Sequence, residues 1–262
     1  MKQNITKRMA LVMAAAAAIS LAGCASAEPS VQTTAAASSD AEVSTPSESV
    51  SSAENDSVFP FTLVTQDEEE VTFTHVPERI LSTNPNTGEQ LMALGLGDKI
   101  IATCYNNAKL PQQWAAEYES KPVIAEKYPS LETVLDLNPD FIYGRSSAFG
   151  DRDSSIATHT KLQENGIMSL ASIEGYKTGC DVEDVYQDFY NLGKIFQVED
   201  RANEIVDGMK EKIASVEEKV SGLEEVSVFN FDSERDGGAY TPGNNFTSKL
   251  IRHAGGVNIF ED

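Results

Sequence analysis

Residues 199–220, EDRANEIVDGMKEKIASVEEKV, decide the fold, because they predict one long helix between two stretches that each alternate strand and helix patterns. Asp200 can cap the start of this helix, and Gly222 follows its end. At about 1.5 Å per residue the helix should span roughly 30 Å. We expect it to brace two lobes. Its apolar residues recur at steps of three and four, which predicts one apolar stripe: Ala202, Ile205, Val206, Met209, Ile213, Val216 and Val220.

The stretch before this helix predicts an α/β lobe. Residues 59–74 predict a hairpin with its turn at 66–69. Strands are then expected at 80–82, 99–103, 141–143 and 167–170, and helices at 87–94, around Trp114, at 130–137 and at 155–164. Strands that alternate with helices predict a parallel sheet, whose ligands bind at the carboxyl ends of the strands. Those ends are the loops after Leu81, Thr103 and Tyr143.

The fold class is therefore α/β, with two parallel-sheet, Rossmann-like lobes bridged by one long helix. A second strand pattern starts at Val226, but roughly 40 residues cannot close an independent core, so we expect the second lobe to be incomplete. The predicted organisation is a lipoprotein signal peptide at 1–23, a disordered tether at 24–57, an N-terminal lobe at 58–198, the bridging helix at 199–222, and the start of a C-terminal lobe at 223–262.

The N-terminus predicts export. A basic segment is followed by an apolar run at 9–21, which is too short to span a membrane comfortably. Leu21-Ala22-Gly23-Cys24 resembles the lipobox of bacterial lipoproteins, in which the cysteine carries the lipid; ordinary cleavage after residues 25–27 is the alternative. Residues 25–57 contain no Lys, Arg or aromatic residue, which predicts a disordered tether. It should hold the folded part on the order of 30 Å from the cell membrane's outer face.

The net charge of −21 argues against some partners. An acidic protein repels phosphate backbones and anionic membrane surfaces alike. We therefore expect no nucleic-acid partner, and membrane association only through the lipid anchor.

Three stretches together resemble one family. They are PERILSTNPNTGEQLMALGLGDKIIA (77–102), YPSLETVLDLNPDFIYG (128–144) and TPGNNFTSKLIRHAGGVNIFED (241–262). They are similar to class III substrate-binding proteins of ABC importers, the receptors for ferric siderophores, haem and cobalamin. The resemblance implies two α/β lobes joined by a rigid helix, a ligand cleft between the lobes, a monomer, and delivery of the ligand to a permease. It implies no cofactor and no catalysed reaction.

The resemblance also implies binding residues at the predicted loop ends. Tyr105, Arg145 and Ser146 match cleft positions after the second and third strands, and Phe231 matches the end of the first C-lobe strand. For Phe231 a core position is the alternative, and for Arg145 a surface salt bridge. The weaker candidates in the same loops are Asn84, Phe149, Arg152 and Tyr240.

Three further predictions concern acids and thiols. Glu132 matches an acidic position that docks on the permease, although a carboxylate in the first turn of a helix is also favoured by the helix dipole. Glu89 ends Asn86-Thr87-Gly88-Glu89, which is typical of a capping box, so it is not assigned to the site. Cys104 and Cys180 are candidates either for a disulfide or for two unpaired thiols.

Two other functions stay open at this stage. A receptor for free metal ions would need clustered ligands, but His75, His159 and His253 are far apart in the sequence, and each is expected to be a surface or capping residue. No metal site of the protein's own is therefore predicted. A tethered surface protein that binds another protein or a glycan is the other alternative. Enzyme motifs such as G-x-S-x-G or G-x-x-x-x-G-K-[ST] do not occur. The predicted function is capture of an iron chelate, most simply a siderophore.

Overall fold

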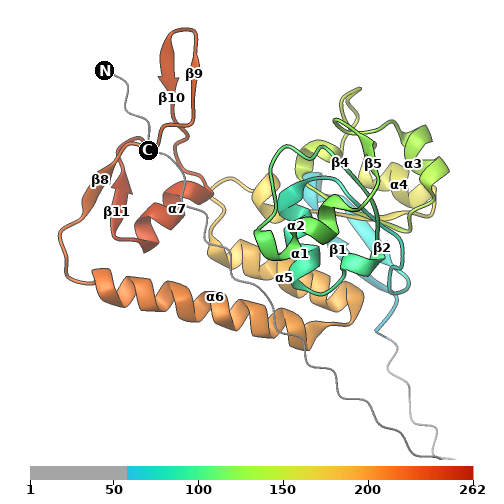
Figure 1. Ribbon diagram of the computed structural model, residues 1–262, viewed down its shortest axis with the longest axis horizontal. Helices are drawn as coiled ribbons and strands as arrows, with labels where there is room; N and C mark the ends of the chain where they lie inside the picture. The colour runs from blue at the N-terminus through green and yellow to red at the C-terminus, as the bar shows by residue number, and fades with distance from the viewer. Residues whose placement is uncertain (1–57, 262) are drawn as a thin grey trace, which may run out of the picture. The chain divides into compact units, whose positions relative to one another are not determined.

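The computed structural model describes residues 58–261 (Figure 1). The signal peptide, Cys24 and the tether lie outside the described residues. The described part opens with the predicted hairpin, in which β1 (Phe61–Val64) pairs antiparallel with β2 (Glu70–Phe73). A short 3-10 helix, Gln66–Glu68, makes the turn.

A five-stranded parallel sheet forms the centre of the N-terminal lobe, with strand order β5-β4-β3-β6-β7. Its strands are β3 (Ile80–Ser82), β4 (Ile100–Cys104), β5 (Val123–Ala125), β6 (Phe141–Gly144) and β7 (Met168–Ala171). The middle strands are short apolar runs, as expected for a sheet that is covered on both faces. The predicted α/β class is confirmed, and β5 is a strand that the sequence analysis missed.

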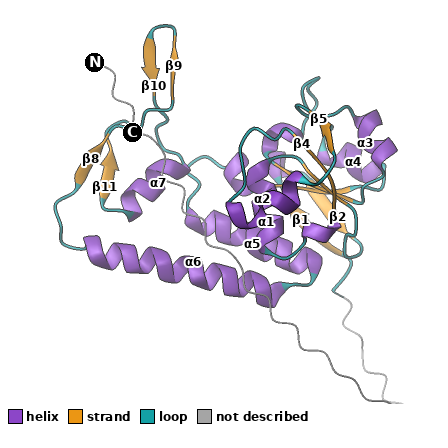
Figure 2. Cartoon of the chain, viewed as in Figure 1, coloured by secondary structure: helices purple, strands orange, loops and turns teal. Residues whose placement is uncertain are grey.

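Helices cover both faces of this sheet (Figure 2). They are α1 (Pro85–Ala93), α2 (Gln112–Glu119), α3 (Leu131–Leu137), α4 (His159–Glu164) and α5 (Val182–Phe196). Alternation along β6 separates two cores: Phe141 and Tyr143 belong to one, and Ile142 belongs to the other.

The starts of α4 and α1 differ from the prediction, and α4 begins at His159, with Thr158 as its N-cap, rather than at residue 155. Helix α1 begins at Pro85 with Asn84 as its N-cap, because proline suits the first position of a helix. The predicted capping box that ended at Glu89 is therefore wrong. Helix α5 was not predicted, although it starts with a capping box in which Asp181 and Asp184 satisfy each other's backbone N–H groups.

The long helix α6 (Glu199–Val220) has the predicted bounds. Its N-cap is Val198, which makes no side-chain capping bond, so the predicted cap at Asp200 is wrong: Asp200 lies inside the first turn. Gly222 follows the end with φ +76°, a backbone conformation that favours glycine. Ala202 of α6 packs closely on α5, where a Cβ added at Gly193 would lie 2.8 Å from the Ala202 Cβ. Ala202 of the predicted apolar stripe thus faces α5, whereas Val220 at the other end of the stripe lies against Gly255.

The C-terminal segment, residues 223–261, contains two small sheets and one helix. Strands β8 (Val226–Val228) and β11 (Gly256–Asn258) pair in parallel, and β9 (Ser233–Arg235) and β10 (Gly238–Tyr240) form a hairpin. Helix α7 (Phe246–His253) lies between β10 and β11 in the chain. The sequence analysis identified the strand pattern at Val226 but did not predict the hairpin of β9 and β10.

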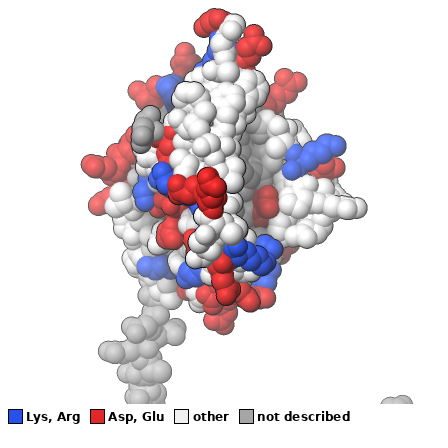
Figure 3. All heavy atoms as spheres, turned by 90° about the vertical axis from the view of Figure 1, so that its left-hand side faces the viewer, with Lys and Arg blue, Asp and Glu red and all other residues white. Residues whose placement is uncertain are grey.

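Large apolar side chains are exposed in this C-terminal segment: Leu223, Val226, Phe229, Phe231, Tyr240, Leu250, Ile259 and Phe260. Figure 3 looks onto the side where these elements lie, and a continuous uncharged area with charged side chains gathered around it occupies much of the view. The segment therefore does not enclose a core like those of the N-terminal lobe.

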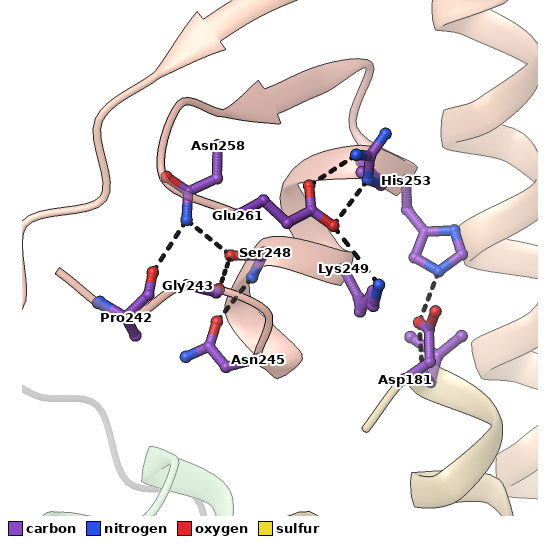
Figure 4. A network of polar contacts seen from close by, with 11 residues as sticks. Asp181, Pro242, Gly243, Asn245, Ser248, Lys249, His253, Asn258 and Glu261 are labelled. Atoms are coloured by element: carbon purple, nitrogen blue, oxygen red, sulfur yellow. Dashed lines mark hydrogen bonds and ion pairs between the residues drawn. The ribbon is translucent and has the colours of Figure 1, made fainter. Parts of the chain in front are cut away.

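Polar contacts hold the C-terminal segment in place of such a core (Figure 4). The Asn258 amide donates to the Pro242 carbonyl at 3.0 Å and to the Ser248 hydroxyl at 2.8 Å. The Glu261 carboxylate accepts from Arg252 Nε at 2.9 Å. His253 joins the segment to two other helices, with Nε2 3.0 Å from Asp181 of the α5 cap and Nδ1 2.7 Å from Glu217 of α6. Among the helices within residues 58–261, none is long and apolar enough to cross a membrane.

Candidate functional site

The main cavity lies where the carboxyl ends of the parallel strands meet α6. Its volume is about 710 Å³. Its wall includes residues that follow β3, β4, β6 and β7, together with residues of α1, α2, α5, α6 and α7. This position agrees with the predicted location of the ligand site at the strand ends.

One wall of the main cavity is aromatic and apolar. Trp114 comes from α2, Phe189 from α5, Ile205 and Met209 from α6, and Phe246 from α7. Ile205 and Met209 belong to the stripe that the helical period predicts. Such a wall can pack against the flat or apolar faces of a large ligand.

Polar residues that line the cavity carry its charged groups. Asn86 and Asn107 supply amides at the ends of β3 and β4. Arg145 Nη2 lies 3.4 Å from Glu174 Oε1, and the two side chains are 44% and 32% exposed. Both the cleft position and the salt bridge considered for Arg145 are therefore present. Burial raises the pKa of Glu89, which also lines this cavity.

A buried carboxyl also lines this cavity. Asp188 of α5 is fully buried, and its two oxygens accept from the backbone N–H of Ile173, each at 3.1 Å. Burial raises the pKa of Asp188 to about 8, so this carboxyl is largely protonated at neutral pH. The neighbouring Ser172 is 2% exposed, and its hydroxyl has no hydrogen-bond partner among the described residues.

A second cavity of about 360 Å³ lies beside the hairpin turn. It is more polar than the main cavity, and its lining includes Asp67, Asp151, Arg152 and Tyr176. Gln66 lines it with a buried Oε1 that has no partner among the described residues.

The predicted binding residues separate into three groups. Arg145 lines the main cavity, whereas Ser146 and Arg152 line the second. Phe149 borders the second cavity, but its side chain is fully buried and stacks on the His159 ring at 4.2 Å, so its main role is in the core. Tyr105 lines neither cavity and packs edge-on against Tyr128 at 5.0 Å.

The two C-terminal candidates also lie away from both cavities. Phe231 is 57% exposed, so it is neither a core residue nor a cavity residue in this structure. Tyr240 is 44% exposed, and the Arg235 guanidinium lies 4.1 Å from the centre of its ring. Their binding role stays a prediction from the resemblance alone.

The remaining predicted residues are Asn84, Glu132 and the two cysteines. Asn84 is buried at the start of α1 and accepts from the Tyr128 hydroxyl at 3.1 Å, so it does not line a cavity. Glu132 is exposed in the first turn of α3, as either interpretation of it requires. Cys104 and Cys180 are buried free thiols, so the disulfide alternative is not realised in this structure.

The histidines form no metal centre. Among residues 58–261 no group of three His, Cys, Asp or Glu side chains could hold an ion. His159 is fully buried, with Nδ1 2.7 Å from the Ser169 hydroxyl, so the expectation of a surface or capping residue is wrong for it. Burial lowers the pKa of His159 to about 4, so it is neutral at physiological pH.

Sequence reasoning missed most of the cavity wall. Trp114 was noted only as the centre of a predicted helix, and Glu174, Asp188, Phe189 and Phe246 were not noted as site residues. Glu174 could have been found as an acid just after β7, because ligands of parallel sheets bind at the carboxyl ends of the strands. Nothing in the local sequence marks the others, because only packing of α5 and α7 brings them to the cavity.

An open parallel sheet whose strand ends lie at a cavity lined by a long helix is an α/β architecture with a candidate ligand site. Residues 80–262 match the periplasmic binding protein family, and the chain belongs to that family. The family resemblance drawn from the three sequence stretches is thereby confirmed.

Curated relatives carry transport and binding names. YvrC, an uncharacterized ABC transporter substrate-binding lipoprotein of Bacillus subtilis, is 27% identical over 189 residues, covering 71% of this chain and 56% of the relative. A vitamin B12-binding protein of Vibrio parahaemolyticus is 25% identical over 183 residues, covering 70% and 61%. A cobalamin-binding protein of Halobacterium salinarum is 23% identical, covering 78% and 52%. The chain thus spans about half the length of the curated relatives it matches.

Solved structures show the same fold. A periplasmic binding protein from Veillonella parvula matches with a TM-score of 0.68 and 26% identity, covering 76% of this chain and 67% of that one. An ABC-type Fe3+-hydroxamate transport system from Saccharomonospora viridis matches with a TM-score of 0.61 and 23% identity, covering 77% and 71%.

Proposed function

We propose that this protein captures a ferric siderophore or a related chelate, such as haem or cobalamin, and delivers it to an ABC permease without catalysing a reaction. The observation that carries the proposal is the main cavity. Its volume falls in the range of roughly 300–1,000 Å³ that is typical of small-molecule sites. It combines an aromatic and apolar wall with a few polar groups, which is the composition that a large chelate requires.

The names of similar proteins support this ligand class. Relatives are named for vitamin B12 and cobalamin, and structures with the same fold are titled as haem-binding, siderophore-binding and Fe3+-hydroxamate transport proteins. In this proposal the chelate, and not the protein, holds the metal.

The proposal includes the surroundings of the receptor. Cys24 carries a lipid that anchors the protein to the outer face of the cell membrane, and residues 25–57 tether the folded part. Glu132, exposed on α3, contacts basic residues of the permease. The protein acts as a monomer and needs no cofactor. One relative is itself named a substrate-binding lipoprotein.

Equilibrium dialysis of the full chain tests the proposal. The probes are ferric trihydroxamate and tris-catecholate complexes, haem, cyanocobalamin, and Fe3+, Zn2+ and Mn2+ as bare ions. Saturable one-to-one binding of at least one chelate is expected. Binding of a bare ion alone would replace the proposal by a free metal-ion receptor. Failure of every probe would overturn it and favour the surface-interaction alternative.

A further inference from the structure

We propose that the main cavity selects chelates by charge, binding cationic ones most tightly, neutral ones that carry N–H donors next, and polyanionic ones least. The inference rests on the proposed function and specifies the ligand of that same site. The shared chemistry is a peripheral amine or amide, which a ferric hydroxamate with a free amine or an amide-bearing corrinoid would supply.

The first argument for this selection is the charge of the groups that line the cavity. Glu89, Glu174 and Asp188 contribute three carboxyl groups. Arg145 is the single cationic side chain among the described residues that line the cavity, and its guanidinium is paired with Glu174. An incoming anion would have to separate Arg145 from that partner and would still face Glu89. An incoming ammonium group meets the Glu89 carboxylate, which is unpaired among the described residues, without breaking the pair of Arg145 with Glu174.

An unpartnered hydroxyl is the second feature of the cavity wall. Ser172 is 2% exposed, lines the cavity just after β7, and has a hydroxyl with no hydrogen-bond partner among the described residues. A buried polar atom without a partner costs free energy, and beside a cavity either a ligand or an ordered water can supply the partner. The hydroxyl can accept an N–H bond from an amine or amide and can also donate to a ligand oxygen, so Ser172 offers a polar contact to a ligand without selecting its charge.

The buried carboxyl of Asp188 gives the third step. The groups around it are acidic or neutral: Glu174 on the adjoining 3-10 helix, Asp184 one turn earlier on α5, and the tyrosines Tyr143 and Tyr176. Arg145, the single cationic side chain among the described residues that line the cavity, is paired with Glu174. Asp188 is therefore held protonated while the cavity is empty, and a cation in the cavity favours its ionised form. Cation binding should release a proton, whereas anion binding should not.

Two ligand pairs, each matched in structure and different in charge, test the selection. Ferrioxamine B carries a protonated amine at pH 7, and its N-acetyl derivative has the same ferric trihydroxamate core without that charge. Cyanocobalamin carries neutral amides, and its monocarboxylate derivative carries one negative charge. Isothermal titration calorimetry of the full chain at pH 7 should show at least tenfold tighter binding for the more positive member of whichever pair binds. Ferric tris-catecholate should bind most weakly.

A variant pair separates cavity charge from overall charge. Glu89→Gln removes one carboxylate from the cavity wall, and Glu211→Gln removes one from an exposed position on α6 that does not line the cavity. The preference within the binding pair should fall at least threefold in Glu89→Gln and stay unchanged in Glu211→Gln. Equal effects of the two variants would overturn selection by the cavity.

Proton release provides a readout specific to Asp188. Titration with ferrioxamine B in two buffers of different ionisation enthalpy should show net proton release near pH 7 that disappears in Asp188→Asn; no release would overturn the role of Asp188. Tris-catecholate or haem that binds as tightly as the positive ligands would overturn the charge selection but leave the chelate receptor standing. Failure of every chelate would instead overturn the proposed function.

Discussion

The N-terminal lobe and the C-terminal segment both contribute residues to the main cavity, but different interactions stabilise them. The lobe packs two apolar cores on a five-stranded sheet, with side chains such as Phe141 fully buried. The C-terminal segment exposes large apolar side chains and holds its elements together through polar contacts (Figure 4). Most of the cavity wall comes from the lobe and α6, whereas the C-terminal segment supplies Phe246.

Helix α6 runs from the lobe to the C-terminal segment, and the burial of its apolar residues differs between its two halves. Its first half buries Ala202 and Val206 completely, whereas Ile213, Val216 and Val220 in its second half are only partly buried. The same apolar stripe is thus completely buried at Ala202 and Val206 and only partly buried in the second half of the helix. The lesson is that periodicity predicts which side of a helix is apolar, but the partner decides how much of it is buried.

The largest expected effect on stability comes from a substitution in the core of the lobe. Phe141→Ala removes a fully buried ring that contacts other aromatic rings in the core, so it should lower the free energy of unfolding by about 3–5 kcal/mol. Phe231→Ala removes a ring that is 57% exposed, and it should change that free energy by less than about 0.5 kcal/mol. Urea unfolding measures both. Similar losses in the two variants would show that the segment is packed as tightly as the lobe.

A smaller effect is expected when a polar contact of the C-terminal segment is removed. Asn258 is 2% exposed and makes three hydrogen bonds within the segment, to Pro242, Ser248 and the Phe260 backbone. Asn258→Ala should destabilise α7 and β11 locally by about 1–3 kcal/mol, because the Ser248 hydroxyl and the Pro242 carbonyl lose a buried donor. Hydrogen exchange should show the loss in the segment while the protection of β3 and β6 stays unchanged. The exposed Asn244→Ala is the matched control, and equal loss of protection in both regions would contradict the separation.

The smallest effect concerns the histidine that joins the segment to α5 and α6. Its contacts with Glu217 and Asp181 outweigh burial and raise the pKa of His253 above its usual value near 6.5. The ion pairs are therefore fully present below about pH 6.5 and are lost as the pH rises through the raised pKa. The deficit of His253→Gln should be about 0.5–1 kcal/mol at pH 6 and should shrink by pH 9. Chemical denaturation at the two pH values measures it, and a deficit independent of pH would contradict the ion-pair account.

The sequence predicts the fold well because its patterns are local. Apolar runs bounded by turns identify β3, β4, β6 and β7, and the three-four period identifies α6 with its observed bounds. The missed strand β5 is three residues long, and its Val123 is 59% exposed, so it carries no buried-strand pattern. Helix α5 was missed even though its capping box is visible at Asp181.

The site is predicted less well because it is assembled from distant segments. The family resemblance points to Arg145, which does line the main cavity, and the position of Glu174 just after β7 could have identified that residue as well. Trp114, Asp188 and Phe246 reach the cavity only through the packing of three different helices, which the local sequence does not encode. Glu89 was set aside for a capping role, and that role disappears because the helix begins two residues earlier than predicted.

The most direct test asks which of the two cavities holds the chelate. Ala108 is an exposed residue that lines the main cavity, and Asp151 is an exposed residue that lines the second, so tyrosine at either position fills one cavity without disturbing a core. The readout is fluorescence of Trp114 in the main cavity during titration of the full chain with ferrioxamine B and with cyanocobalamin. The account predicts saturable quenching that Ala108→Tyr weakens at least tenfold and Asp151→Tyr leaves unchanged. The opposite pattern, with Asp151→Tyr abolishing binding and Ala108→Tyr sparing it, would contradict the assignment of the site.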